Sequence, residues 1–114
     1  MSKQDVENYE TASLFSLEGK TALVTGGSSG LGLIMAKGLL CNGVRVVIAS
    51  RSQKKCDMAL AELSEFGECW SLATDVTKSQ DRERLLQFVE AQLGGLSILI
   101  NNAGANLWLY FELQ

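Results

Sequence analysis

The chain has 114 residues, of which 46% are hydrophobic and 20% are charged, and its formal net charge is −3 at pH 7. This length suits one domain, and the composition is that of a folded globular protein. The negative charge and the lack of a basic stripe argue against nucleic acid or an anionic membrane as a partner. No apolar run approaches the ~18 residues that cross a bilayer, and residues 1–10 lack the apolar core of a secretory signal. We therefore expect a cytoplasmic protein.

Three cysteines, Cys41, Cys56 and Cys69, stand 15 and 13 residues apart, and the chain has no histidine. This spacing fits neither a zinc site nor a disulfide framework. We expect reduced, mostly buried thiols and no metal site.

After a polar arm at residues 1–13, short β-rich apolar runs alternate with segments of helical period. In chain order we predict a strand at 21–25, a helix at 31–41, a strand at 44–49, a helix at 53–66, a strand at 69–73, a helix at 81–93 and a strand at 96–101. The glycines at 43, 67, 94 and 95 follow the predicted helices and are typical stop signals.

Helical spacing also predicts an apolar stripe on each helix. These stripes are Leu31, Ile34, Met35, Gly38 and Leu39 on the first helix, Met58, Ala61, Leu63 and Phe66 on the second, and Leu85, Leu86, Val89 and Leu93 on the third.

The order βαβαβαβ, with strands that are apolar on both faces, predicts a parallel sheet covered by helices on both sides. Right-handed crossovers make this an α/β, Rossmann-type doubly wound sheet, of which the chain carries the N-terminal half. We divide the chain into the arm at 1–13, a half-domain at 14–104 and a divergent apolar tail at 105–114.

A glycine-rich turn follows the first predicted strand and reads Thr25-Gly26-Gly27-Ser28-Ser29-Gly30-Leu31-Gly32. A pyrophosphate has to approach backbone N–H groups at a helix N-terminus, and side chains would block that approach. Gly26 allows a tight turn, Gly30 allows close approach, and Gly32 lets the helix pack on the sheet. Ser28 and Ser29 can donate to phosphate oxygens or to ribose. The turn predicts a dinucleotide site, and a glycine-rich connection without a ligand is the alternative.

The spacing Gly-x-x-x-Gly-x-Gly resembles the short-chain dehydrogenase/reductase family, whose signature is Thr-Gly-x-x-x-Gly-x-Gly. The resemblance runs from about Leu14 to Gly104. Asp75-Val76 follows the third predicted strand, where the family has an acidic residue that contacts the adenine. Asn101-Asn102-Ala103-Gly104 matches the family's Asn-Asn-Ala-Gly motif, which borders the adenosine ribose and braces the sheet.

The second predicted strand ends in Ala49-Ser50-Arg51-Ser52. An NAD-binding fold usually presents an Asp or Glu there to the ribose 2′-hydroxyl, and this chain has none. Arg51 can pair bidentately with a 2′-phosphate, and Ser50 can donate a hydrogen bond to it. Lys54 adds positive potential nearby, whereas Lys55 is better explained as a solvated residue. We therefore expect NADP(H) in preference to NAD(H).

The motifs and this strand end together give the expected cofactor-binding residues, with no metal ligand among them. They are Thr25, Gly26, Ser28, Ser29, Gly30, Leu31, Gly32, Ser50, Arg51, Asp75, Val76, Asn102, Ala103 and Gly104.

The stretches GKTALVTGGSSGLG and RVVIASR, with Cys56-Asp57 after them, are similar to reductases of the 3-oxoacyl-[acyl-carrier-protein] type, the rhamnolipid-biosynthesis branch above all. The 2,4-dienoyl-CoA reductases share the Ala-Ser-Arg strand end. This resemblance implies reduction of a carbonyl substrate by hydride transfer from a nicotinamide.

The family's catalytic residues are an Asn, a Ser and a Tyr-x-x-x-Lys that follow the Asn-Asn-Ala-Gly strand. Tyr9 is followed four residues later by Ser13, and Tyr110 by Gln114, so neither tyrosine forms this pattern. We expect no catalytic residue in this chain and no activity of the chain alone.

The tail at 105–114 departs from the family where a long helix should begin, and we interpret it as a truncation. A fourth strand without its parallel neighbour would then be an apolar edge, prone to self-association. One alternative function is a non-catalytic nucleotide-binding module that associates with a full-length partner. Another doubly wound class, such as a methyltransferase, is disfavoured by the glycine-serine turn together with Asn-Asn-Ala-Gly.

Overall fold

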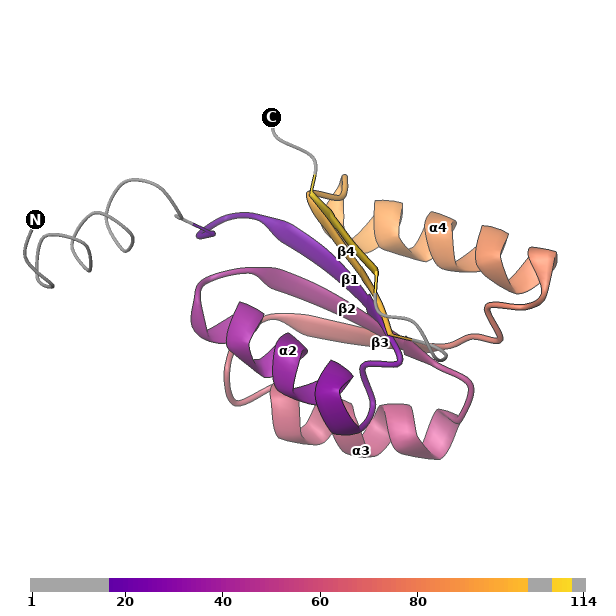
Figure 1. Ribbon diagram of the computed structural model, residues 1–114, viewed down its shortest axis with the longest axis horizontal. Helices are drawn as coiled ribbons and strands as arrows, with labels where there is room; N and C mark the ends of the chain where they lie inside the picture. Colours follow the sequence, from indigo (N-terminus) through magenta and orange to yellow (C-terminus); the bar gives the residue numbers. More distant parts are fainter. Residues whose placement is uncertain (1–16, 103–107, 112–114) are drawn as a thin grey trace, which may run out of the picture.

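The computed structural model describes residues 17–102 and, as backbone, the strand at 108–111. The polar arm at 1–13 lies outside the described residues. The described residues contain one sheet of five strands in the order β3-β2-β1-β4-β5 (Figure 1). In chain order the strands are β1 (Thr21–Thr25), β2 (Arg45–Ser50), β3 (Cys69–Ala73), β4 (Ile98–Asn101) and β5 (Trp108–Phe111).

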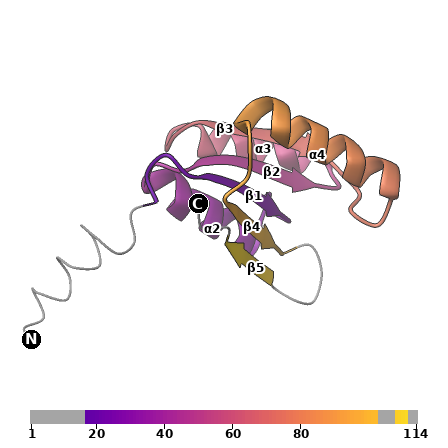
Figure 2. The same cartoon turned by 90° about the horizontal axis from the view of Figure 1, so that it is seen from above.

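Three described helices join the four parallel strands. They are α2 (Gly30–Cys41), α3 (Gln53–Leu63) and α4 (Ser79–Leu93). Helices α2 and α3 cover one face of the sheet and α4 covers the other, as both views show (Figures 1 and 2). The predicted doubly wound α/β fold is therefore confirmed. None of the helices in the described part of the chain is long and apolar enough to cross a membrane.

Alternation along the strands divides the core into two layers, because successive side chains of a strand point to opposite faces. On β1, Ala22 and Val24 pack under α2 and α3, whereas Leu23 packs under α4. On β2, Val47 and Ala49 share the α4 face. Every residue of β1 is buried, as expected of a strand covered on both sides.

The predicted apolar stripe of the first helix is wrong in part, because Met35 and Leu39 pack against the core whereas Leu31, Ile34 and Gly38 are exposed. Helix α2 buries Gly32, Ala36 and Leu40, whereas Ile34 is 68% exposed and Leu31 is also exposed. The physical reason is close packing: a Cβ atom at Gly32 would overlap the carbonyl oxygen of Gly26. Small residues therefore face the sheet at the start of α2, and the larger apolar side chains lie beside this face or away from it.

The predicted apolar stripes of the other two helices are confirmed in part and wrong in part. Helix α3 ends at Leu63 and not at 66, and it buries Cys56, Ala59 and Leu63 while Met58 is exposed. The predicted positions Ala61 and Phe66 are exposed as well. Helix α4 buries the predicted Leu85, Val89 and Leu93, whereas Leu86 is exposed.

The expectation of an uncovered fourth strand is also wrong. Strand β5 pairs with β4 in antiparallel register, with Ile98 opposite Phe111 and Asn101 opposite Trp108 (Figure 2). Residues 108–111 read Trp-Leu-Tyr-Phe, which are residue types that favour strands, so the predicted apolar tail supplies a partner for this edge. The proposed route to self-association through an exposed β4 thereby loses its premise.

Candidate functional site

The carboxyl ends of three neighbouring strands meet at one edge of the sheet. Thr25 of β1 pairs in register with Ala49 of β2 on one side and with Asn101 of β4 on the other. Thr25 Oγ1 donates to Asn101 Oδ1 at 2.7 Å, and the backbone N–H of Asn102 donates to Thr25 Oγ1 at 3.1 Å. The start of the Asn-Asn-Ala-Gly motif is therefore tied to the strand that leads into the glycine-rich turn.

The β1–α2 turn, residues 26–29, is shaped by the absence of side chains. The backbone N–H of Gly26 donates to the carbonyl oxygen of Ala49 at 2.7 Å, and Gly26 has a φ of 68°. A Cβ atom at Gly27 would lie 2.7 Å from Ile48 Cγ2, and one at Gly32 would lie 2.9 Å from Asn102 Nδ2. The turn therefore packs against β2, and the start of α2 packs against Gly26 and Asn102, so closely that Gly27 and Gly32 have no room for a side chain.

Helix α2 begins at this turn with an open N-terminus. Its N-cap residue, Ser29, makes no side-chain hydrogen bond to the helix, and the first turn of α2 has no acidic residue. Helix α3 differs, because the Ser52 side chain accepts a hydrogen bond from the backbone N–H of Lys55 at 3.2 Å. The first N–H groups of α2 thus have no side-chain cap, which leaves them suited to an anion.

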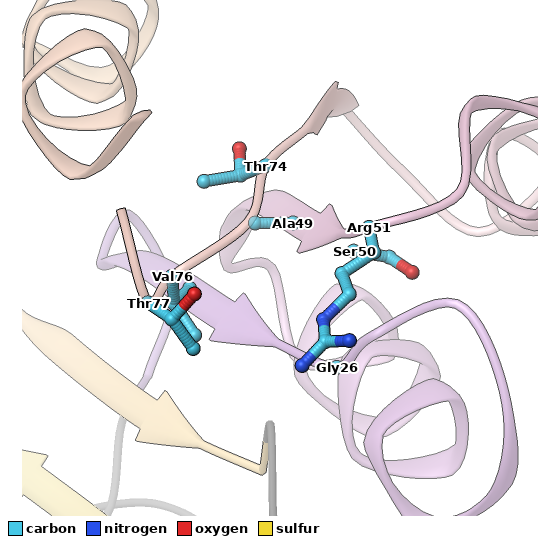
Figure 3. A pocket seen from close by; sticks show the side chains of 7 residues that line it. All are labelled: Gly26, Ala49, Ser50, Arg51, Thr74, Val76 and Thr77. Atoms are coloured by element: carbon cyan, nitrogen blue, oxygen red, sulfur yellow. The ribbon is translucent and has the colours of Figure 1, made fainter. Parts of the chain in front are cut away.

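A cavity of about 340 Å³ lies beside the turn, at the ends of β2 and β3 (Figure 3). It is lined by Gly26, Ala49, Ser50, Arg51, Thr74, Val76 and Thr77. Figure 3 shows the Arg51 side chain extending across this cavity toward Gly26. Its volume is at the lower end of the range for small-molecule pockets, about 300–1,000 Å³.

The carboxylate of Asp75 lies next to this cavity, 4.0 Å from the Arg51 side chain. Asp75 Oδ1 accepts hydrogen bonds from the side chain of Thr77 at 2.6 Å and from its backbone N–H at 3.0 Å. These hydrogen bonds hold the pKa of Asp75 below its ordinary value. The same oxygen lies 4.0 Å from Nε of Arg51, whose side chain is 76% exposed. Arg51 is therefore oriented by a charged partner and still accessible to a ligand.

A second cavity of about 400 Å³ lies between the starts of α2 and α3, and it is lined by Ser28, Ser29, Ser52, Lys54, Lys55 and Met58. Its wall is joined to that of the first cavity by a hydrogen bond of 2.9 Å from Ser28 Oγ to Ser50 Oγ. Lys54 and Lys55 are both exposed here. The two cavities together place hydroxyl groups and three positive charges around the end of β2.

The structure brings most of the predicted site residues to this edge of the sheet. Gly26, Ser50, Arg51 and Val76 line the first cavity, and Ser28 and Ser29 line the second. The remaining described ones occupy neighbouring positions: Thr25 ends β1, Gly30, Leu31 and Gly32 begin α2, Asp75 pairs with Arg51, and Asn102 donates to Thr25. Ala103 and Gly104 lie outside the described residues.

Sequence reasoning missed several residues of this region. Gly27 packs on Ile48, while Ala49, Thr74 and Thr77 line the first cavity, and Ser52 and Met58 line the second. The signal for Thr77 was present in the sequence, because Asp-x-Thr is a common spacing for a turn in which the Asp side chain accepts from the residue two positions later.

A doubly wound sheet with a glycine-rich turn into an open helix N-terminus, next to a cavity at the strand ends, defines a dinucleotide-binding domain. The family model of the short chain dehydrogenases matches residues 20–112. The chain therefore belongs to the short chain dehydrogenase family, whose members are oxidoreductases that bind a nicotinamide dinucleotide.

Several relatives match over most of this chain. The rhamnolipids biosynthesis 3-oxoacyl-[acyl-carrier-protein] reductase of Pseudomonas aeruginosa is 41% identical over 92 residues, which are 81% of this chain and 36% of that protein. A 2-dehydro-3-deoxy-D-gluconate 5-dehydrogenase of Formosa agariphila is 42% identical over 80% of this chain and 35% of its own length. The chain thus spans about a third of the length of these relatives.

Two solved structures of the same fold are named as complexes with different cofactors. The complex of Pseudomonas aeruginosa RhlG with NADP matches with a TM-score of 0.74 and 41% identity, over 79% of this chain and 35% of that one. The structure of NAD⁺-bound xylitol dehydrogenase matches with a TM-score of 0.76 and 28% identity, over 80% of this chain and 35% of that one. The shared fold is therefore compatible with either cofactor.

Proposed function

We propose that this chain binds NADP(H), as the cofactor-binding part of a short-chain carbonyl oxidoreductase. The observation that carries the proposal is the pair Ser50-Arg51 at the end of β2, which lines the same cavity as Gly26 of the glycine-rich turn. Because relatives of the same fold are named with NADP and with NAD⁺, the choice between the two has to come from residues of this chain.

The β1–α2 turn fits the part that both cofactors share, the pyrophosphate. Gly27 in the turn and Gly32 in the first turn of α2 have no room for a Cβ atom, so the backbone is free of side chains at these positions. The N-terminus of α2 has neither a side-chain cap nor an acidic residue in its first turn. An anion there would accept hydrogen bonds from backbone N–H groups and gain from the helix dipole, an interaction worth about 0.3–1 kcal/mol at an exposed site.

The end of β2 fits a 2′-phosphate. Arg51 is 76% exposed and can form a bidentate pair with a phosphate, and Lys54 and Lys55 line the adjoining cavity. A carboxylate does lie nearby, in Asp75, but it is held by Thr77 and it pairs with Arg51. A second carboxylate, Asp81, accepts a hydrogen bond from the Asp75 backbone N–H at 2.9 Å. The three basic groups Arg51, Lys54 and Lys55 still exceed these two carboxylates in number, which favours a ligand that carries the additional phosphate.

The remaining lining fits an adenosine. Val76, Thr74 and Ala49 supply apolar surface beside the polar atoms of Ser50 and Thr77. This chain would therefore hold the adenosine and the phosphates and orient them at the strand ends. In the oxidoreductases of the family, the nicotinamide of the cofactor supplies the hydride that reduces a carbonyl.

The test of cofactor choice is a titration of the purified chain with NADPH and with NADH, followed by fluorescence. We expect NADPH to bind more tightly than NADH. We expect Arg51→Ala to lower the affinity for NADPH by about tenfold to 100-fold and to change the affinity for NADH by much less. Arg84→Ala is the matched control, since Arg84 is an exposed arginine of α4. Equal losses of NADPH and NADH affinity in Arg51→Ala would overturn the assignment to NADP(H).

The chain contains the cofactor motifs without Tyr-x-x-x-Lys, and we propose that it does not reduce carbonyl compounds by itself. The measurement is the oxidation of NADPH, followed by its absorbance, with the purified chain and a 3-oxoacyl thioester. We expect no rate above that of the buffer. Turnover that scales with the concentration of the chain would contradict this, whereas binding without turnover is also the result for a nucleotide-binding module.

A further inference from the structure

We propose that Ser28 is a positioning residue for recognition of the 2′-phosphate, and that it acts through Ser50 without binding the phosphate itself. The proposal rests on the function proposed above and adds the role of one hydroxyl group to it. It differs from the expectation that Ser28 donates directly to a phosphate or a ribose.

The carrying observation is the hydrogen bond in which Ser28 Oγ donates to Ser50 Oγ at 2.9 Å, between residues 22 positions apart in the sequence. A serine hydroxyl has one proton to donate and two lone pairs to accept with. Ser28 uses its proton in this bond, so its hydroxyl can only accept from any further group. Ser50 accepts in the same bond, and its own proton is left to donate to a ligand.

The positions of the two hydroxyl groups determine where the Ser50 proton points. Ser50 lines the cavity that contains Arg51, whereas Ser28 lines the adjoining cavity with Lys54 and Lys55. One lone pair of Ser50 Oγ is occupied from the Ser28 side, so the Ser50 O–H bond is turned away from Ser28. A phosphate held by Arg51 would accept this proton, and donation from Ser28 would polarise the Ser50 hydroxyl and strengthen the bond.

The backbone around Ser28 fixes its distance from Ser50. On the N-terminal side, Gly26 N–H donates to Ala49 O at 2.7 Å, directly before Ser50. Gly27 has no room for a Cβ atom against Ile48, which is also on β2. The turn is therefore held against the last three residues of β2. If the turn moved away from β2, these contacts would be lost, so they keep Ser28 within hydrogen-bond distance of Ser50.

This role predicts an effect on the discrimination between ligands with and without a 2′-phosphate, and not on affinity in general. A ligand without a 2′-phosphate gains little from the orientation of the Ser50 proton. Loss of the Ser28 hydroxyl therefore lowers the affinity only for the ligand that carries a 2′-phosphate. Once the Ser50 hydroxyl has been removed, loss of the Ser28 hydroxyl has no further effect on this affinity.

The experiment is calorimetric titration of the full chain with adenosine 2′,5′-bisphosphate and with adenosine 5′-monophosphate, which differ in the 2′-phosphate alone. We expect Ser28→Ala to lower the ratio of the two affinities by about threefold to tenfold, the worth of one hydrogen bond. Ser50→Ala lowers it at least as far, and the double variant no further than Ser50→Ala. Ser28→Thr keeps the hydroxyl group and should have the affinity ratio of the wild type. Ser64→Ala, at the end of α3, should also leave this ratio unchanged.

Other outcomes separate the failure of this role from that of the proposed function. If the wild-type chain shows no preference for the bisphosphate, the NADP(H) assignment fails and the role of Ser28 fails with it. If the preference exists and Ser28→Ala keeps it, only the role of Ser28 is overturned. The role is also overturned if Ser28→Ala weakens both ligands alike, or if it lowers the ratio equally in the Ser50→Ala background. Far-ultraviolet circular dichroism checks folding, and Ser28→Cys, whose thiol is a weak donor, replaces the alanine variant if that one fails to fold.

Discussion

The β1–α2 turn (residues 26–29) and the β2–α3 turn (residues 51–52) make the same kind of connection, from a parallel strand to a helix, with different residue types. Each joins a buried parallel strand to a helix on the same face of the sheet (Figure 1). The first turn contains Gly26 and Gly27 and leads into a helix without a side-chain cap. The second consists of Arg51 and Ser52, and Ser52 caps its own helix.

The difference is one between shape and chemistry. In the first turn, Gly27 brings the backbone against β2, and the Ser29 side chain leaves the first N–H groups of α2 without a cap, which suits the pyrophosphate of any dinucleotide. In the second turn, a guanidinium and hydroxyl groups surround a cavity, which suits the group by which one dinucleotide differs from another. A side chain added at Gly32, which packs on the first turn, should therefore damage the fold, and substitution of Arg51 in the second turn should change the ligand.

The largest effect is expected for Gly32→Ala. The added Cβ would overlap the carbonyl oxygen of Gly26 and lie 2.8 Å from its carbonyl carbon, and both are backbone atoms that cannot rotate away. We expect the free energy of unfolding in urea to fall by about 3 kcal/mol or more, at the upper end of the cost of overpacking.

The matched control is Gly38→Ala on the same helix. A Cβ at Gly38 meets nothing within 4 Å, and Gly38 lies in the helix interior with ordinary backbone geometry. Alanine should stabilise the helix there by about 0.5–1 kcal/mol. If both alanine variants change the free energy of unfolding alike, the steric account of the first turn is wrong.

Arg51→Asp should change the ligand and leave the fold intact. The new carboxylate would repel a 2′-phosphate and could accept a hydrogen bond from a ribose 2′-hydroxyl. We expect the ratio of NADPH to NADH affinity to fall by about 100-fold or more, since a charge-assisted interaction is lost and a repulsion is added. Titration with both cofactors and a urea unfolding curve test this together. An unchanged affinity ratio would show that the second turn does not choose the cofactor.

The strands and the glycine turn could be predicted from the sequence because their signals are local. The run 21–25 is apolar and ends in glycines, and the observed β1 has the same bounds. Glycines that sit between a strand and a helix reflect short-range sterics, which the residue types themselves encode. The end of β2 was also readable, since Ser50 and Arg51 follow a β-branched run directly.

The helix faces and the final strand could not be read in the same way. The buried face of α2 contains Gly32 and Ala36, and hydrophobic spacing favours Leu31 and Ile34 instead. Which stripe is buried depends on how near the helix lies to the sheet, and this is a tertiary contact. Strand β5 pairs with β4 across residues 103–107, and a short apolar segment reads equally well as a tail.

Loss of the helix cap in the second turn should have a smaller effect. Ser52→Ala removes the acceptor of the Lys55 N–H, and we expect a loss of about 1 kcal/mol in the free energy of unfolding. Ser29→Ala at the first turn should cost clearly less, because Ser29 makes no side-chain cap hydrogen bond. Urea unfolding of the two variants in parallel measures the difference. Equal losses would mean that the two helix N-termini are not distinguished by their caps.

The smallest effect concerns Asp75, which links the second turn to the end of β3 through Arg51. Hydrogen bonds from Thr77 hold the pKa of Asp75 below its ordinary value of 3.8. The charged carboxylate therefore stabilises the folded chain above pH 3.8, and this contribution is lost as the pH falls through the lowered pKa. We expect Asp75→Asn to be slightly less stable than the wild type at neutral pH, with the difference vanishing on acidification.

The cause of the lowered pKa can be separated from the effect of Arg51. The side-chain hydrogen bond from Thr77 is the largest cause, ahead of the charge of Arg51. Thr77→Val should therefore raise the pKa of Asp75 more than Arg51→Ala does, as measured by nuclear magnetic resonance titration of the Asp75 carboxyl group. The reverse order would make Arg51 the stronger partner of Asp75. In that case a ligand phosphate would have to draw Arg51 away from Asp75, and the second turn would select its cofactor less strongly than its charges indicate.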